Sequence, residues 1–171
     1  MGIKPMARIF IAIRFDDEFK KALVAIQDSL KEQGIQGNYC PYGNLHLTLA
    51  FIGESYDLDA IRKALSEVSF KPFDLTLDKL GSFPTKEGVI WCGLKDDAPV
   101  VELASQLRKR LAANEVSYKE EEVFYPHISL VQHPSTIMTD IDLPKASMQV
   151  EKIFIMKSER MDGELTYSEI Q

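Results

Sequence analysis

The sequence predicts an α+β fold of two pseudo-symmetric lobes, each a mainly antiparallel β-sheet with outer helices, and a cleft between them. Two observations predict this class. Segments typical of strands, with alternating or continuous apolar residues, are interspersed with segments whose apolar residues recur every three or four positions, as in helices. The order strand, helix, strand also occurs twice at nearly equal spacing. With 171 residues, the chain has the length of one domain, and we expect residues 1–171 to form a single bilobal one.

Three segments have helical spacing. The first begins at Asp16 or Asp17, either of which can cap a helix, and ends near Gly34. The second spans Leu58 to Val68, and the third follows Pro99. The apolar stripe of the first comprises Phe19, Ala22, Leu23, Ile26 and Leu30, and that of the third comprises Val100, Leu103, Ala104, Leu107 and Leu111.

Seven segments are predicted to be strands because they alternate or are rich in β-formers. These are residues 9–14, 46–49, 73–80, 89–94, 127–130, 148–157 and 165–170. Turns fit the glycine-containing segments between them, at 34–38, 84–88 and 161–163.

Two of these strands repeat one motif. Residues 46–49 read His-Leu-Thr-Leu and residues 127–130 read His-Ile-Ser-Leu, in a chain with only three histidines. Residues two apart in a strand share a face, so each imidazole should lie beside a hydroxyl, with the two apolar residues turned to the core. A single such histidine is more often structural, but two matched motifs favour a functional site.

The residues before the two motifs also match. A strand at Ile9 precedes His46 by 37 positions, and a strand at Val89 precedes His127 by 38. In both cases a pair of aspartates that can begin a helix follows the strand. The chain is therefore expected to contain two copies of a strand-helix-strand unit, each ending in one histidine.

Paired histidines suit in-line displacement at phosphorus. At neutral pH one imidazole can act as a base while the other, if its surroundings raise its pKa, acts as an acid. The hydroxyls of Thr48 and Ser129 can hold the non-bridging phosphate oxygens. Neither His46 nor His127 has the closely spaced ligands of a zinc site, so no metal or other cofactor is expected. One alternative remains. His127 and His133 are six positions apart and would lie on the same face of a continuous strand, so both could contribute to a metal site.

The sequence resembles the 2H phosphoesterases, and within them the bacterial and archaeal RNA 2′,3′-cyclic phosphodiesterases, also called 2′-5′ RNA ligases. The resemblance rests on residues 8–13, 44–53, 75–83, 89–91 and 126–130. It implies that His46 is the proton donor to the leaving oxygen and His127 the proton acceptor that activates water, so that a 2′,3′-cyclic phosphate opens to a 2′-phosphate. It also implies a reversible 2′-5′ RNA ligase activity.

The chain departs from the family pattern at two positions. Ser129 stands where threonine is usual, which keeps the hydroxyl but loses the stiffening β-branch. Gln132 stands where many members place an arginine that meets the substrate phosphate, and glutamine brings no charge. Arg14, Lys119 and His133 are candidate substitutes for that arginine, although solvated surface charge is the simpler interpretation of each.

The composition bears on partners. The net charge is −6, and no basic stripe for long RNA is visible, so we expect RNA termini or small cyclic nucleotides as substrates. Tyr42 and Tyr125 are candidates for stacking on a base.

Cys40 and Cys92 form no disulfide framework. The amino-terminal apolar stretch is too short for an export signal or a membrane span, so we expect a cytoplasmic protein. No feature of the sequence implies a protein partner, and we expect a monomer.

Two other functions stay open. One is a 2H phosphodiesterase for a different cyclic or 2′-5′-linked nucleotide, such as an ADP-ribose or oligoadenylate derivative, which Gln132 favours. The other is a non-catalytic nucleotide-binding module, against which the intact histidines and hydroxyls argue.

Overall fold

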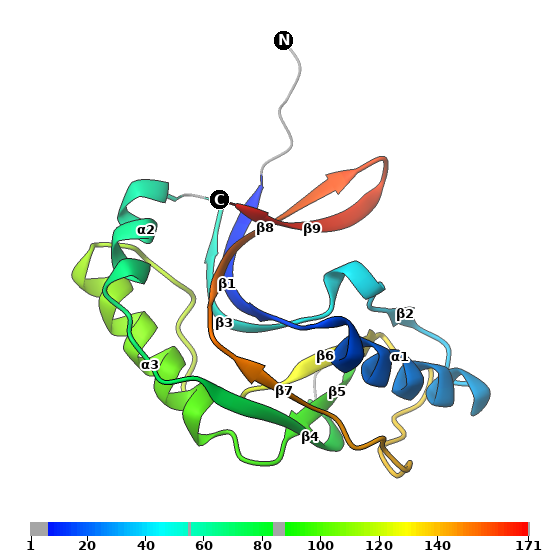
Figure 1. The fold of residues 1–171 in the computed structure, drawn as a ribbon. Helices are drawn as coiled ribbons and strands as arrows, with labels where there is room; N and C mark the ends of the chain where they lie inside the picture. Colours follow the sequence, from blue (N-terminus) through cyan, green and yellow to red (C-terminus); the bar gives the residue numbers. More distant parts are fainter. Residues whose placement is uncertain (1–6, 55, 84–87, 171) are drawn as a thin grey trace.

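The computed structural model describes residues 7–54, 56–83 and 88–170, which form two antiparallel sheets with helices on their outer sides (Figure 1). Sheet A has the order β3-β1-β8-β9 and sheet B the order β2-β6-β5-β4-β7. The strands of sheet A are β1 (Arg8–Arg14), β3 (His46–Gly53), β8 (Phe154–Met161) and β9 (Glu164–Ile170). Those of sheet B are β2 (Asn38–Tyr39), β4 (Phe73–Ser82), β5 (Val89–Leu94), β6 (Ile128–Gln132) and β7 (Ser147–Val150). The helices are α1 (Asp17–Glu32), α2 (Leu58–Ser66), α3 (Ala98–Ala113) and the short 3₁₀ turn η1 (Tyr42–Asn44).

The predicted α+β class is confirmed, and so are the three helices. Asp16 is the N-cap of α1, where its carboxylate accepts a hydrogen bond from the Phe19 amide at 2.8 Å. Gly34, just past the end of α1, has φ +82°, the left-handed conformation that glycine adopts at low cost. The predicted turn at 161–163 joins β8 to β9, with φ +53° at Asp162 and +82° at Gly163, the pattern of a two-residue hairpin turn.

Two element predictions are wrong. Residues 148–157 were expected to form one strand, but the chain leaves sheet B after Val150 and enters sheet A at Phe154. Apolar residues continue on both sides of this crossing, so the sequence pattern hides it. Asn38 was expected in a turn but pairs with Gln132 as part of β2, because edge strands of two residues carry little sequence signal. The predicted turn at 84–88 lies largely outside the described residues.

Sheet A is apolar on both faces, which explains the continuous apolar run of β1. Ile9, Ile11 and Ile13 belong to the main core. Phe10 and Ala12 point the other way and form a small second cluster with Met156 of β8. The second cluster supports the side of the sheet on which His46 lies, since Phe10 contacts the His46 ring.

Helices α1 and α3 each pack against the sheet to which the preceding strand does not belong. Helix α1 follows β1 of sheet A, yet packs against β6 of sheet B, and α3 follows β5 of sheet B, yet packs against β3 of sheet A. In Figure 1, α1 accordingly lies on the opposite side of the molecule from α2 and α3. Each half of the chain thus supports the motif strand of the other half.

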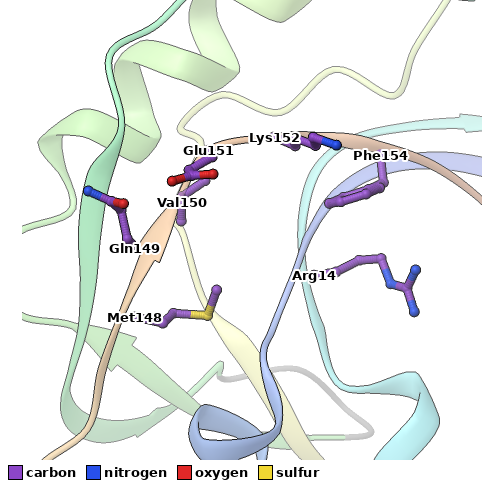
Figure 2. A pocket seen from close by; sticks show the side chains of 7 residues that line it. All are labelled: Arg14, Met148, Gln149, Val150, Glu151, Lys152 and Phe154. Carbon is purple, nitrogen blue, oxygen red and sulfur yellow. The ribbon is translucent and has the colours of Figure 1, made fainter.

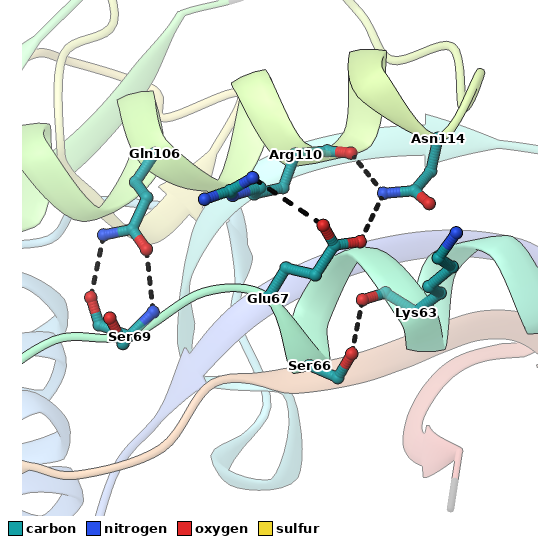
Figure 3. A network of polar contacts seen from close by, with 7 residues as sticks. All are labelled: Lys63, Ser66, Glu67, Ser69, Gln106, Arg110 and Asn114. Carbon is teal, nitrogen blue, oxygen red and sulfur yellow. Dashed lines mark hydrogen bonds and ion pairs between the residues drawn. The ribbon is translucent and has the colours of Figure 1, made fainter.

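Helix α2 is held to α3 by polar contacts at its end. Glu67 accepts a hydrogen bond from the Asn114 amide at 3.0 Å and forms an ion pair with Arg110 at 3.7 Å (Figure 3). Nearby, the side-chain amide of Gln106 bonds both backbone groups of Ser69 at 2.7 and 2.8 Å. These contacts are exposed, so their net contribution to stability is small.

Candidate active site

A cleft of about 790 Å³ contains both histidines of the repeated motifs. Its volume falls in the range of small-molecule sites. The cleft is lined from sheet A and its flanking loop by Pro41, Asn44, His46, Thr48, Arg160, Glu164, Leu165, Thr166 and Tyr167, and from sheet B and the approach to it by Asn38, Tyr39, Cys40, His127, Ser129 and Gln132. The predicted alternation is confirmed in both motifs, where histidine and hydroxyl residue are half-buried and the intervening residues are buried.

The two imidazoles are oriented by the same backbone contact. His46 Nδ1 lies 2.7 Å from the backbone oxygen of Asn44, and His127 Nδ1 lies 2.8 Å from that of Tyr125, each two residues earlier. A carbonyl oxygen can only accept, so Nδ1 must carry hydrogen in both rings. The neutral form of each histidine therefore has its basic lone pair on Nε2.

The Nε2 atoms differ in their partners. His46 Nε2 lies 2.7 Å from Thr48 Oγ1, so that hydroxyl donates to the neutral ring or accepts from the protonated one. His127 Nε2 has no hydrogen-bond partner in the part of the chain that the structure describes, and its lone pair is available to accept a proton. Ser129, unlike Thr48, does not bond its histidine.

The pKa of His46 is lowered in the protein. Burial is the main cause, because it disfavours the charged imidazolium, and the nearby His127 lowers the pKa further. The hydrogen bond to the Asn44 carbonyl acts in the opposite direction. The sequence analysis expects the surroundings to raise the pKa of the histidine that acts as an acid, whereas the protein groups around His46 lower it. An anionic phosphate beside the ring would reverse this, since a neighbouring negative charge favours the protonated form.

Aromatic rings flank each histidine. On sheet A, Phe10 and Tyr167 lie 4.9 and 5.2 Å from the His46 ring, centroid to centroid. On sheet B, Phe83 and Trp91 lie 4.8 and 6.2 Å from the His127 ring. These contacts restrict the imidazoles to a narrow range of orientations.

Asn44 links His46 to the β8–β9 hairpin. Its backbone oxygen accepts from His46, while its buried side-chain amide donates to the Leu165 oxygen at 2.9 Å and accepts from the Tyr167 amide at 3.2 Å. One residue thus fixes both the histidine tautomer and the strand that forms one wall of the cleft.

The predicted phosphate-binding residues Thr48, Ser129 and Gln132 all line the cleft. The stacking candidates do not. Tyr42 is exposed, with its hydroxyl donating to Asp17 at 2.6 Å and the Lys20 ammonium over its ring. Tyr125 is also exposed, and its ring packs against those of Phe83 and Trp91.

The proposed substitutes for the missing arginine also lie elsewhere. Arg14 forms an ion pair with Glu169 at 2.9 Å and lies beside Phe154 in a separate pocket of about 210 Å³ (Figure 2). Lys119 is exposed, and its backbone amide pairs with Phe51. His133 lies just after the end of β6 and has φ +53°, so it is not on a strand face shared with His127.

The sequence analysis missed the contribution of the β8–β9 hairpin. Arg160, Leu165, Thr166 and Tyr167 line the cleft. Alternation predicted a strand at 165–170 but not which sheet it joins or what it faces. Asn44 enters the sequence analysis only within the segment 44–53 that carries the resemblance. Its role depends on a hydrogen bond to Leu165, a residue more than a hundred positions later in the chain.

The cysteines are poor nucleophiles. Burial raises the pKa of the Cys40 thiol to about 11 and that of Cys92 to about 12, so both are protonated at neutral pH. Among the described residues, no group of three His, Cys, Asp or Glu side chains is placed to hold a metal ion. In the same residues, no helix combines the length and apolar character needed to cross a bilayer.

The paired histidines in a cleft between two antiparallel sheets define a two-histidine phosphoesterase architecture. Residues 15–162 match the model of the 2′-5′ RNA ligase superfamily, and the chain belongs to this family. It is 30% identical over 128 residues, covering 72% of this chain and 70% of the relative, to an RNA 2′,3′-cyclic phosphodiesterase of Archaeoglobus fulgidus. It is 29% identical over 168 residues, covering 88% and 86%, to a protein of the same name from Thermotoga maritima.

Solved structures agree. The crystal structure of Escherichia coli LigT in apo form superposes with a TM-score of 0.81 and 25% identity, covering 99% of this chain and 96% of that one. The same E. coli protein has been solved in complex with 3′-AMP, with a TM-score of 0.79 to this chain at 25% identity, covering 99% and 96%. The predicted family and fold class are confirmed.

Proposed function

We propose that this protein is an RNA 2′,3′-cyclic phosphodiesterase that opens cyclic phosphate ends to 2′-phosphates by acid-base catalysis with two histidines and no metal. The observation that carries the proposal is the matched pair of half-buried imidazoles in one cleft, each with Nδ1 hydrogen-bonded to a backbone oxygen, so that Nε2 is the nitrogen that exchanges a proton with the substrate. The names of the relatives support the same activity.

The two histidines take different roles. His127 Nε2, free of other partners, accepts a proton from the attacking water as the new bond from the water oxygen to phosphorus forms. His46 Nε2, protonated once the phosphate is bound, gives its proton to the 3′ oxygen as the bond from phosphorus to that oxygen breaks. The products are a 2′-phosphate and a 3′-hydroxyl. The same sequence of steps, with the 5′-hydroxyl of a second RNA end in place of water, would join two RNA ends through a 2′-5′ linkage as the bond from phosphorus to the 3′ oxygen breaks.

The hydroxyls of Thr48 and Ser129 lie two residues along from each histidine and line the same cleft. They can donate to the non-bridging oxygens, where charge accumulates in the transition state. Thr48 also bonds His46, so phosphate binding and protonation of His46 are coupled through this hydroxyl.

The test is an assay of the purified protein with 2′,3′-cyclic nucleotides and with RNA that ends in a cyclic phosphate, in buffer containing EDTA. We expect hydrolysis that survives the chelator and yields only the 2′-phosphate, identified by NMR or chromatography. Hydrolysis that stops with EDTA and returns with a divalent ion would overturn the metal-independent mechanism. No turnover of any cyclic phosphate would overturn the function and favour a nucleotide-binding module.

A specific observation favours a second candidate, a 2H phosphodiesterase for another cyclic or 2′-5′-linked nucleotide. Gln132 lines the cleft, and the family pattern that the sequence resembles has an arginine at this position, so the charge near the reacting phosphate would differ from that pattern. Including 2′-5′ oligoadenylate and a cyclic phosphate derived from ADP-ribose in the assay separates this candidate from the first.

A further inference from the structure

The β8–β9 hairpin (Phe154–Met161, Glu164–Ile170) brings one arginine, Arg160, to the cleft, and no carboxylate of the described residues forms an ion pair with it. The sequence contains six arginines, all within the described residues. Five of them lie within 4 Å of a carboxylate, namely Arg8, Arg14, Arg62, Arg108 and Arg110. Arg160 forms no ion pair with any residue that the structure describes.

Arg160 is also the only lysine or arginine among the cleft-lining residues in the described chain. One guanidinium nitrogen, Nη1, donates to the Gly163 oxygen at 3.2 Å, which holds the side chain against the hairpin turn. A guanidinium has five N–H donors in a planar fork, so most remain for a ligand. Such a fork suits a phosphate group.

The position of Arg160 along the hairpin separates it from the reacting phosphate. Ser158 of β8 pairs with Tyr167 of β9, whose ring contacts His46. Arg160 follows Ser158 by two residues on the same face, about 7 Å farther along the strand at the usual rise. One nucleotide can span this distance.

Leu165 lies directly opposite Arg160 in the hairpin and shares its face. It is 42% exposed, and it is the one exposed large apolar residue of the described chain that lines the cleft. The hairpin therefore offers an apolar surface beside a cation, a combination that fits a nucleoside next to its phosphate.

We propose that Arg160 binds a second phosphate of the substrate, one nucleotide step from the cyclic phosphate that reacts. The inference rests on the proposed function. It makes Arg160 a specificity-determining residue, through which the enzyme distinguishes substrates with an additional phosphate from bare cyclic nucleosides. The charge absent at Gln132 is thus present across the cleft, where it recognises a different part of the substrate.

The test compares two substrates that differ in one phosphate, a nucleoside 2′,3′-cyclic phosphate and the same compound with a 5′-phosphate. The wild-type enzyme should show a kcat/KM about tenfold higher for the second, since charge-assisted hydrogen bonds are roughly twice as strong as neutral ones. Arg160→Gln should remove this preference through KM, with less than a twofold change for the first substrate. Arg160→Lys should retain part of it. The control is Arg110→Gln, an exposed, ion-paired arginine on α3, which should leave both substrates unchanged.

A binding measurement separates this inference from the proposed function. Calorimetric titration with the nucleoside 2′-phosphate, with and without a 5′-phosphate, should show a preference of about tenfold for the second that Arg160→Gln abolishes. For the doubly phosphorylated ligand, the number of ions released on binding, obtained from the salt dependence of the affinity, should be about one lower in Arg160→Gln than in the wild type. Equal effects of Arg160→Gln on both ligands, or none on either, would overturn the role of Arg160 even if the enzyme hydrolyses cyclic phosphates. Absence of all hydrolysis by the wild type would instead overturn the proposed function.

Discussion

The side-chain amide of Gln27, on α1, donates one hydrogen bond to the Leu130 oxygen on β6 and another to the Cys40 oxygen, both at 2.9 Å. Leu130 is the last residue of the second histidine motif. The equivalent residue of the first motif, Leu49, accepts from Arg108 of α3 at 3.1 and 3.2 Å. Each histidine strand is thus held, three residues past its histidine, by a side chain from the helix of the other half of the chain.

Gln27→Leu should destabilise the protein by about 1–3 kcal/mol, because it removes two side-chain hydrogen bonds, one of them buried, although the Leu130 oxygen still accepts from the Cys40 amide at 2.9 Å. Urea unfolding followed by circular dichroism measures this. Gln106→Leu is a matched control, since Gln106 also makes two backbone hydrogen bonds but at an exposed site. The control should lose less than about 1 kcal/mol. Equal losses in the two variants would contradict the importance of the buried contact.

His46→Ala and His127→Ala should each lower kcat by about 10²–10⁴-fold, the usual contribution of one positioned acid or base. Circular dichroism should show both variants folded. The double variant should lose much less than the product of the single losses, because both groups act on one displacement. His133→Ala, at an exposed position after β6, is the control and should retain full activity. Near wild-type turnover by either motif variant would exclude the two-histidine mechanism.

The lowered pKa of His46 predicts how the cleft responds to ligand. In the free protein, His46 should be protonated only below the ordinary histidine range. Inorganic phosphate or a nucleotide should raise its pKa, because the bound anion stabilises the imidazolium. By linkage, ligand affinity should then increase as pH falls toward the pKa of the bound state. NMR titration of the three histidines, with and without phosphate, follows the shift; an unchanged His46 titration would contradict the coupling.

The same lowered pKa has a consequence for folding. Below the pKa of the unfolded chain, the unfolded state binds more protons at His46 than the native state does, so stability should fall as pH decreases there. Replacing His46 by glutamine should flatten this part of the stability profile. The measurement is the urea midpoint between about pH 5 and pH 8 for both proteins, and identical slopes would count against the burial effect.

Gln132→Arg should lower KM for cyclic phosphate substrates by up to about tenfold, because it adds a charge-assisted contact where Gln132 lines the cleft. The gain should shrink with added salt and should not depend on a 5′-phosphate, unlike the effect of Arg160. A KM that is unchanged at low and high salt would show that residue 132 does not meet the phosphate.

Gly81→Ala should disturb the second histidine through Trp91. The two residues pair across β4 and β5, and a Cβ at Gly81 would clash with the Trp91 ring. The indole must move, and it lies 6.2 Å from the His127 ring. We expect a loss of stability of about 1–3 kcal/mol and a lower kcat, measured by urea unfolding and assay. A shifted tryptophan fluorescence spectrum should accompany both changes, and unaltered fluorescence and kcat would contradict this packing.

The sequence by itself determined the features that depend on local pattern. Strand alternation placed His46 beside Thr48 and His127 beside Ser129, and apolar spacing located the three helices, because side-chain direction within one element follows from backbone geometry. The duplicated order of elements predicted two similar halves, and the repeated motifs identified the two histidines and the family.

Only the tertiary structure decided which surfaces meet. The sequence did not show that α1 supports the sheet of His127 and α3 that of His46, since no local pattern records the partner of an apolar stripe. It named Arg14 as a candidate substitute for the missing arginine, with surface charge as the simpler interpretation, and Tyr42 as a candidate for stacking; in the structure Arg14 pairs with Glu169 and Tyr42 with Asp17. Arg160 reaches the cleft through strand pairing between β1 and β8, residues about 150 apart in the chain, and such long-range pairing is fixed by packing of the whole chain rather than by the residues around Arg160.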